Sequence, residues 1–142
     1  MYRCDAAVSP LDPTLPPIAD LPPGYVRLTA NAQRLSVNFR FRTGSSQLDN
    51  KAVDDLDRVT AYLASASARD KQVMLIGFAD NKGSTQSNQT LSNERAKIVD
   101  RQFTSRGVLA GVSIGFGSAV PVASNETDDG REKNRRVEVW LR

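Results

Sequence analysis

Residues 72–79, QVMLIGFA, form an almost unbroken apolar run, and they constrain the fold more than any other segment. The run has the length of a strand, and a strand without polar alternation is typical of a sheet interior that is covered on both faces. Apolar residues at helical spacing stand on either side, at 49–66 and at 87–106. Because a strand, a helix and a buried strand in succession imply a crossover connection, the pattern predicts an α/β fold.

Further strands are predicted where apolar and polar residues alternate. RLSVNFRF at 34–41 has this period, and YVRLTA at 25–30 is expected to form a hairpin with it. VSIGFG at 112–117 is another strand, and REKN at 131–134 is a short helical turn. RRVEVWLR at 135–142 closes the chain, with a charged face expected to be open to water or a partner. Together, these strands and helices predict one α/β domain, an α+β sandwich with two main helices packed on a mixed sheet.

The start of the chain has a different character. Six of the seven prolines lie within the first 23 residues, which excludes a regular helix or a central strand there. We interpret residues 1–24 as a proline-rich tether and residues 25–142 as the folded domain. Neither a signal peptide nor a membrane-spanning apolar run of about 20 residues is visible. The chain is therefore expected to be either cytoplasmic or a fragment of a longer exported protein.

Composition excludes several classes of site. The sequence has no histidine, which is the commonest general base and metal ligand. A single cysteine, Cys4, excludes an internal disulfide and a thiolate metal cluster, leaving an exposed thiol, a cross-link to another chain or a lipidation site. Sixteen acids offset nineteen bases, so the formal charge of +3 permits an anionic partner without requiring one. We predict no enzyme, no cofactor and no metal site.

Arg95 stands out on the second helix. At 100° per residue it falls in the apolar sector, with Leu91, Ala96, Ile98, Val99 and Phe103. A guanidinium there either extends past its neighbours to water or is paired. Asp80, at the C-terminal end of the buried strand, is the expected partner, because sites open there in crossover folds. The two form either a structural salt bridge or a pair complementary to a zwitterion, with ammonium at Asp80 and carboxylate at Arg95.

Two longer stretches carry a family resemblance. GFADNKGSTQSNQTLSNERAKIVDRQFTSRGV and GFGSAVPVASNETDDGREKNRRVEVWL resemble the peptidoglycan-binding OmpA-like C-terminal domain family, which includes the peptidoglycan-associated lipoprotein and the flagellar stator B protein. The similarity runs from Val37 to Leu141. It implies a βαβαβ-type sandwich that binds the stem peptide of peptidoglycan non-covalently, typically through meso-diaminopimelate, and anchors an envelope protein to the wall.

The resemblance also implies roles for individual residues. Asp80 is expected to receive the ammonium of diaminopimelate and Arg95 its carboxylate, with Asn88 near the ligand. Asn134 and Arg135 are expected to wall the site on the other side. The resemblance implies a periplasmic, envelope-associated location, and the tether suggests an upstream fused domain or envelope partner.

Some positions depart from the family pattern or carry a structural role in it. Ala79 stands where the family usually has Thr or Ser, so one hydroxyl near the site is missing. Arg42 follows the first strand where many members have Asp, which would make the pocket more basic. Arg131 and Arg136 are implied to brace the fold.

Other functions have specific arguments for and against them. The chain has no Gly-x-Ser-x-Gly, and Ser92 and Lys97 project from different sides of their helix, which disfavours an enzyme. Basic strands with aromatic residues suggest nucleic-acid binding, but Phe39 and Phe41 lie on an apolar face and are expected in the core. A protein–protein docking module remains the alternative, with Trp140 on the last strand as its anchor.

Overall fold

The computed structural model of the chain describes residues 21–48 and 50–142. Most of the proposed tether, Cys4 and the expected helix start at Asp49 lie outside these residues. The domain boundary between residues 24 and 25 therefore stays a prediction.

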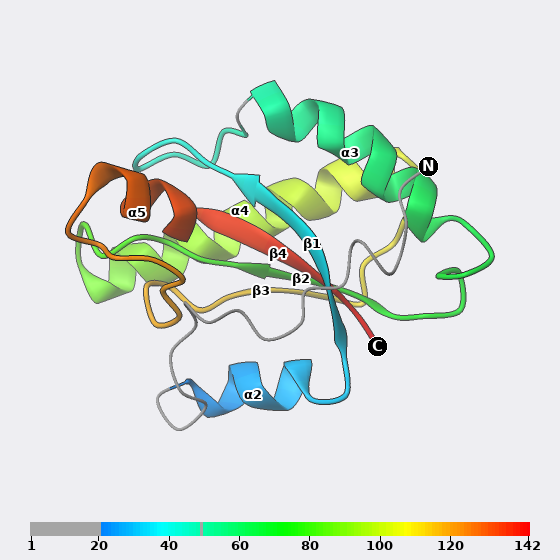
Figure 1. The fold of residues 1–142 in the computed structure, drawn as a ribbon, viewed down its shortest axis with the longest axis horizontal. Coiled ribbons are helices and arrows are strands. Elements are labelled where there is room, and N and C mark those ends of the chain that lie inside the picture. Colours follow the sequence, from blue (N-terminus) through cyan, green and yellow to red (C-terminus); the bar gives the residue numbers. More distant parts are fainter. Residues whose placement is uncertain (1–20, 49) are drawn as a thin grey trace.

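The described residues form a four-stranded mixed sheet with helices on both faces (Figure 1). The helices are α2 (Pro23–Thr29), α3 (Asn50–Leu63), α4 (Thr85–Ser105) and α5 (Asp128–Asn134). The strands are β1 (Gln33–Arg40), β2 (Val73–Gly77), β3 (Val112–Gly115) and β4 (Arg136–Leu141). They are ordered β1-β4-β2-β3, with β2 and β3 parallel and β4 antiparallel to both of its neighbours. This arrangement confirms the predicted α+β sandwich.

The larger core lies between the sheet and the helices α3 and α4, which cross the same face of the sheet (Figure 1). Phe39 and Phe41 are buried in this core, as their place on an apolar strand face predicted. β2 is an interior strand, and every one of its residues is buried. The apolar run therefore has the position that its lack of polar alternation indicated.

Helix α4 begins two residues before the predicted start. The Ser84 hydroxyl accepts a hydrogen bond from the Ser87 amide, which caps the first turn. Gly107, just beyond the helix, has a φ of 86°, and glycine adopts this conformation without strain. The predicted end of the helix was thus right to within one residue.

The segment YVRLTA is helical, so the predicted hairpin with the following strand is wrong. Pro23 stands at the first position of α2, where its fixed φ favours a helix and its missing N–H costs nothing. The apolar residues of so short a run suit a strand and a helical turn equally well. β1 pairs with the distant β4 instead.

The charged face of β4 is buried, which corrects the expectation that it faces water or a partner. Arg136 and Glu138 are both 0% exposed and form an ion pair. α2 covers this face, and its Tyr25 donates a hydrogen bond from the hydroxyl to Glu138 and meets the ring of Trp140 edge-on. Arg34 from β1 completes the cluster, 3.3 Å from Glu138. The charged residues of β4 are thus paired inside the protein and do not form part of its surface.

Trp140 is partly buried beneath α2 and donates its indole N–H to Glu138. A tryptophan that is engaged in this way does not present an exposed anchor. Trp140 therefore gives no support to the alternative of a docking module.

Candidate functional site

The candidate site lies where β2 ends and the chain turns into α4. Close contact between this strand and this helix depends on Gly77, because a Cβ there would stand 2.1 Å from the main-chain oxygen of Ser92. The contact sets α4 directly beside the end of β2. Asp80 follows the strand by three residues, and Arg95 lies on the helix face that packs against the sheet.

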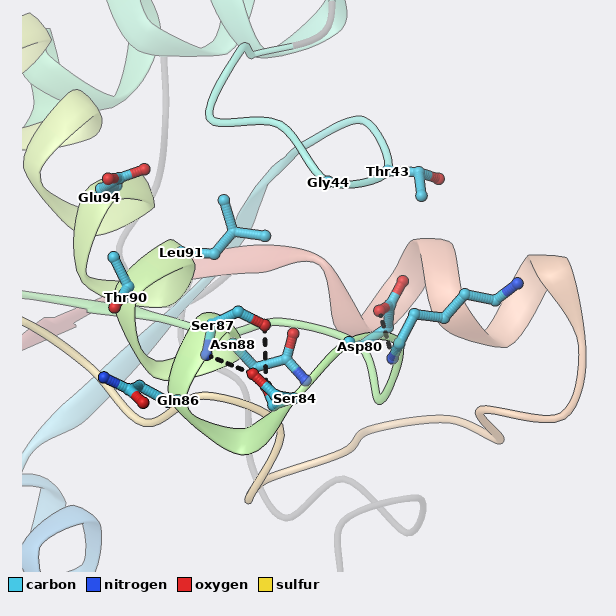
Figure 2. Close-up of a pocket in the computed structure, with 12 residues that line it drawn as sticks. Thr43, Gly44, Asp80, Ser84, Gln86, Ser87, Asn88, Thr90, Leu91 and Glu94 are labelled. Atoms are coloured by element: carbon cyan, nitrogen blue, oxygen red, sulfur yellow. Dashed lines mark hydrogen bonds between the residues drawn. The ribbon is translucent and has the colours of Figure 1, made fainter.

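A cleft of about 760 Å³ opens between α4, the β2–α4 loop and the loop after β1. Figure 2 shows Asp80 near one end of it and Glu94 near the other, with Thr43 and Gly44 opposite the helix. Most of the residues that line it have polar or charged side chains: Thr43, Gly44, Asp80, Lys82, Gly83, Ser84, Gln86, Ser87, Asn88, Thr90, Leu91 and Glu94. The cleft therefore suits a polar ligand that hydrogen-bonds along its length.

Asp80 is the buried acid of the cleft, with an exposed fraction of 5%. Its Oδ1 accepts a hydrogen bond from the Lys82 amide at 3.0 Å, in a turn closed by the aspartate side chain. Its Oδ2 accepts one from Nη1 of Arg135, also at 3.0 Å. A carboxylate has about four lone-pair positions, so these two bonds orient Asp80 and leave acceptor capacity for a ligand.

Arg95 is enclosed, with an exposed fraction of 0%. Its Nε, Nη1 and Nη2 donate to the carbonyl oxygens of Ser45, Phe78 and Arg42, at 3.0 to 3.1 Å. Burial lowers the pKa of the guanidinium to about 10, while the charge of Asp80 acts in the opposite direction. The group is therefore still charged at neutral pH, and its charge interacts with that of Asp80, which lines the cleft.

Arg95 neither extends its head to water nor forms a salt bridge with Asp80. Its head does not reach water, and Asp80 forms its ion pair with Arg135 rather than with Arg95. Main-chain carbonyls accept three hydrogen bonds from the guanidinium instead, and its Cζ lies 5.3 Å from the centroid of the Phe41 ring. Sequence spacing could not reveal this, because every residue carries a carbonyl and only the fold decides which ones converge.

Asn88 lines the same cleft as Asp80. Only 4% of it is exposed, and its side chain has no hydrogen bond to any residue that the structure describes. Its carboxamide is therefore available to a molecule in the cleft.

Asn134 does not line the cleft. It is completely buried, and its Oδ1 accepts hydrogen bonds from the amides of Val122 and Ala123. Its Nδ2 donates to the Ala123 carbonyl and to Asn125. These bonds hold the loop before α5, and Asn134 lines neither the cleft nor the smaller hollow beside Arg135.

Arg135 lines a second, smaller hollow of about 200 Å³. Thr43 and Lys82 line both the cleft and this hollow, so the two adjoin. The other lining residues are Asp128, Asp129, Arg131 and Glu132. Arg131 is tied to Asp128 and to the Asn125 carbonyl, which agrees with a bracing role.

Lys82, Thr43 and Glu94 were not singled out from the sequence. Exposed polar residues on loops and helices are too common to carry a signal by themselves. One indication for Lys82 was present in the sequence. It stands two residues after Asp80, where an aspartate side chain can close a turn and bring the next residues back toward it.

Within the described residues, no group of three or more acidic or cysteine side chains is placed to hold a metal ion. The same residues include no helix that is both long and apolar enough to cross a membrane.

Comparison with known proteins gives a consistent family assignment. Residues 40–135 match the model of the OmpA family. The peptidoglycan-binding protein ArfA of Mycobacterium tuberculosis (strain H37Rv) is 47% identical over 72 residues, which cover 49% of this chain and 22% of that protein. The peptidoglycan-associated lipoprotein of Pseudomonas putida is 32% identical over 114 residues, covering 76% of this chain and 64% of the relative.

Solved structures agree on the fold. The peptidoglycan-associated lipoprotein from Burkholderia pseudomallei superposes with a TM-score of 0.66 at 21% identity, covering 74% of this chain and 89% of that one. The C-terminal domain of Helicobacter pylori MotB gives a TM-score of 0.66 at 23% identity, with 75% and 84% covered. The match to ArfA spans about a fifth of that relative's length.

Proposed function

The chain belongs to the OmpA family, and from that premise we propose that it binds cell-wall peptidoglycan non-covalently through the diaminopimelate of the stem peptide. The observation that carries the proposal is the cleft at the end of β2, which contains one buried carboxylate, Asp80, with two guanidinium groups behind it. The names of two relatives support the same function, since one is a peptidoglycan-binding protein and the other a peptidoglycan-associated lipoprotein.

The charges of the site suit a zwitterion. The ammonium of diaminopimelate would bind the free acceptor positions of Asp80 from the cleft. Arg95 and Arg135 together carry two positive charges against the one negative charge of Asp80, so a second negative group is favoured beside the ammonium. The carboxylate on the same carbon of diaminopimelate supplies that group.

The size and lining of the cleft suit the rest of the stem peptide. A volume of about 760 Å³ exceeds what one amino acid fills. Asn88, Ser87 and Thr90 offer amide and hydroxyl groups along the helix, which can pair with peptide N–H and C=O groups. We propose binding without turnover, because no activated nucleophile or general base is needed to hold such a ligand.

The cellular role follows from the same proposal. A domain that binds the wall and is joined by the proline-rich segment to an upstream domain or partner would anchor an envelope protein to peptidoglycan. Its place would be the periplasmic side of the cell envelope.

The proposal is tested by co-sedimentation of the chain with purified sacculi that contain diaminopimelate. Asp80→Asn keeps the shape and the hydrogen-bond acceptor of the side chain but removes its charge, and it should lower the affinity at least tenfold, about 1.4 kcal/mol. Asp54→Asn is the matched control, because Asp54 is an exposed acid on α3 outside the cleft, and it should bind as the wild type does. Undiminished sedimentation of Asp80→Asn would place the ligand elsewhere.

A further inference from the structure

Tyr25 is the one buried residue of α2, the helix on the face of the sheet opposite α3 and α4 (Figure 1). Its ring meets the rings of Phe78 and Phe116 edge-on, with centroids 5.7 and 5.6 Å away. Its hydroxyl donates to Glu138 at 2.8 Å. Phe78 directly follows β2, Phe116 directly follows β3, and Glu138 belongs to β4. One side chain of α2 therefore contacts three neighbouring segments of the sheet.

Phe78 joins this contact to the candidate site. Its ring touches Tyr25 on one side, and the Cζ of Arg136 lies 3.9 Å from its centroid. Its carbonyl accepts the hydrogen bond from Arg95, and Asp80 follows it by two residues. Phe78 is 0% exposed, and a ring enclosed in a close-packed interior moves only together with its backbone or its neighbours. The position of Tyr25 is therefore passed on to Arg95 and Asp80.

A second connection from α2 runs along β4. Glu138 accepts the Tyr25 hydroxyl, and its Oε2 accepts hydrogen bonds from Arg136 at 3.0 and 2.8 Å. Arg135 precedes Arg136 in the chain and donates to Asp80 at 3.0 Å. The buried ion pair beneath α2 thus adjoins the residue that orients the acid of the cleft.

The end of β3 supplies a third connection. Gly117, next to Phe116, accepts a hydrogen bond from the Ala79 amide at 2.8 Å. The amide of Gly117 donates to the Ser92 hydroxyl on α4, also at 2.8 Å. The segment that packs against Tyr25 is therefore bonded both to the β2–α4 loop and to the helix that lines the cleft.

The helix α2 can leave the sheet as a unit. It has seven residues, and no side chain caps its N-terminus. A helix this short is not stable by itself in water, so its folding depends on docking. Elements with few buried contacts open at a lower free energy than a whole domain. The docked and released positions of α2 therefore define two states of the protein.

We infer that Tyr25 is a positioning residue for the cleft, and that docking of α2 and binding of the ligand favour each other across the sheet. The inference rests on the proposed function and adds a means of regulation to that same site. With α2 docked, the strand ends that carry Asp80 and Arg135 are held in place. The proline-rich segment precedes α2 in the sequence, so a partner or a load that acts on that segment and releases α2 would lower the affinity of the cleft.

The first test measures the affinity of the full chain for the tripeptide L-Ala-γ-D-Glu-meso-diaminopimelate by calorimetric titration. Tyr25→Ala removes the ring and the hydroxyl, and it should weaken binding roughly tenfold, which is within the usual range of coupling between two sites. Tyr25→Phe keeps the ring contacts and should weaken binding by roughly threefold or less. Arg27→Ala is the matched control on the exposed side of α2 and should bind as the wild type does.

The second test uses the wild type, so it also covers a Tyr25→Ala variant that does not fold. Coupling is reciprocal, so the ligand must hold α2 on the sheet by the factor by which α2 tightens binding. Saturating tripeptide should therefore slow amide hydrogen exchange in α2 by roughly tenfold, while α2 still exchanges faster than the buried β2, that is, by local opening. Trp140 is the only tryptophan of the chain and meets Tyr25 edge-on, so its emission should shift to longer wavelength in Tyr25→Ala.

Two results would each overturn the inference and leave peptidoglycan binding intact: equal affinity of Tyr25→Ala and Arg27→Ala, or exchange in α2 that the tripeptide does not change. If the wild type does not bind the tripeptide, the proposed function fails, and the coupling is measured without a ligand. The Lys82 amide, which donates to Asp80 at 3.0 Å, should then exchange faster in Tyr25→Ala than in Arg27→Ala. Equal exchange of this amide in the two variants would refute the positioning role of Tyr25.

Discussion

Arg95 joins three segments that are far apart in the sequence. Its guanidinium binds carbonyls in the loop after β1, at Arg42 and Ser45, and at the end of β2, at Phe78. These segments form the two sides of the cleft next to Asp80. A buried charge is costly unless it is hydrogen-bonded, and three of the five N–H groups of this guanidinium donate to carbonyl oxygens, which add no second charge. The shape of the cleft therefore depends on a residue that does not line it.

Gly77 sets how closely α4 approaches the sheet, and a prediction follows at this residue. In Gly77→Ala the new Cβ would stand 2.1 Å from a main-chain oxygen of the helix, so α4 must shift. We expect a loss of about 3 kcal/mol in the free energy of unfolding, measured by urea denaturation. Gly24→Ala is the control, because its Cβ would meet only the Phe116 ring at 3.3 Å, and it should change stability by less than about 1 kcal/mol. Equal stability of the two variants would contradict the account.

At the scale of elements, α2 and β4 hold a charged cluster inside the protein. Glu138 accepts hydrogen bonds from Tyr25, Arg136 and Trp140, and it is completely buried. Burial raises the pKa of Glu138, but the charges of Arg136 and Arg34 and the hydrogen bonds together lower it below its usual value of 4.5. The folded state therefore favours the ionised form of this carboxylate.

The sign of this effect gives a pH dependence. Because the folded pKa is lower than the unfolded one, the ionised carboxylate contributes stability that is fully present above about pH 4.5 and is lost as the pH falls through the folded pKa. In Glu138→Gln two buried arginines lose their counter-charge, which should cost about 3 kcal/mol at pH 7. The difference from wild type should shrink as the pH falls below 4.5. Urea unfolding between pH 3 and 7 measures it, and a difference independent of pH would be the contrary result.

Tyr25→Phe tests the hydrogen bond between α2 and Glu138 separately from the ion pair that Glu138 forms with Arg136. The variant loses the hydrogen bond to Glu138 but keeps the ring contacts with Phe78, Phe116 and Trp140. We expect it to lose about 2 kcal/mol in unfolding free energy at pH 7, since the lost bond is to a charged group. A loss as large as that of Glu138→Gln would mean that docking of α2, rather than the charge cluster, dominates the stability of this face.

The sequence predicted those elements whose pattern is local. β2, α3, α4, β3 and β4 all lie within a few residues of the ranges that apolar spacing indicated. The helix α2 was missed because its six-residue pattern fits a strand and a helical turn equally well. The proline at its first position, which favours a helix, decides between the two. The burial of the charged face of β4 was missed because alternating apolar and charged residues show that the two faces of a strand differ. The alternation does not show what covers each face.

The site was partly predictable for the same reason. Strand-end position singled out Asp80, which lines a cleft, and helical spacing put Arg95 in the apolar sector of its helix, where it is buried. Which arginine touches Asp80 depends on long-range pairing: Arg135 lies 55 residues away along the chain. No periodic pattern carries that information.

At the scale of the whole molecule, the candidate site residues gather at one end of the two central strands, where β2 ends and β4 begins. The sheet topology sets the end of β2 beside the start of β4 and the end of β1 (Figure 1). The loops that follow β1 and β2, together with α4 and α5, line the cleft and the smaller hollow. A separate polar hollow of about 610 Å³ lies between β1 and α3, with Arg40, Lys51 and Arg58 in its lining. The proposed ligand site is the first of these locations and not the second.

The most direct test of this claim is amide chemical-shift mapping of the ¹⁵N-labelled chain with the diaminopimelate tripeptide. We predict saturable shifts grouped at residues 43–44 and 80–94, which border the cleft, and at Arg135. Shifts grouped instead on β1 and α3 around the separate hollow, or none at saturating ligand, would contradict the assignment of the cleft as the peptidoglycan site.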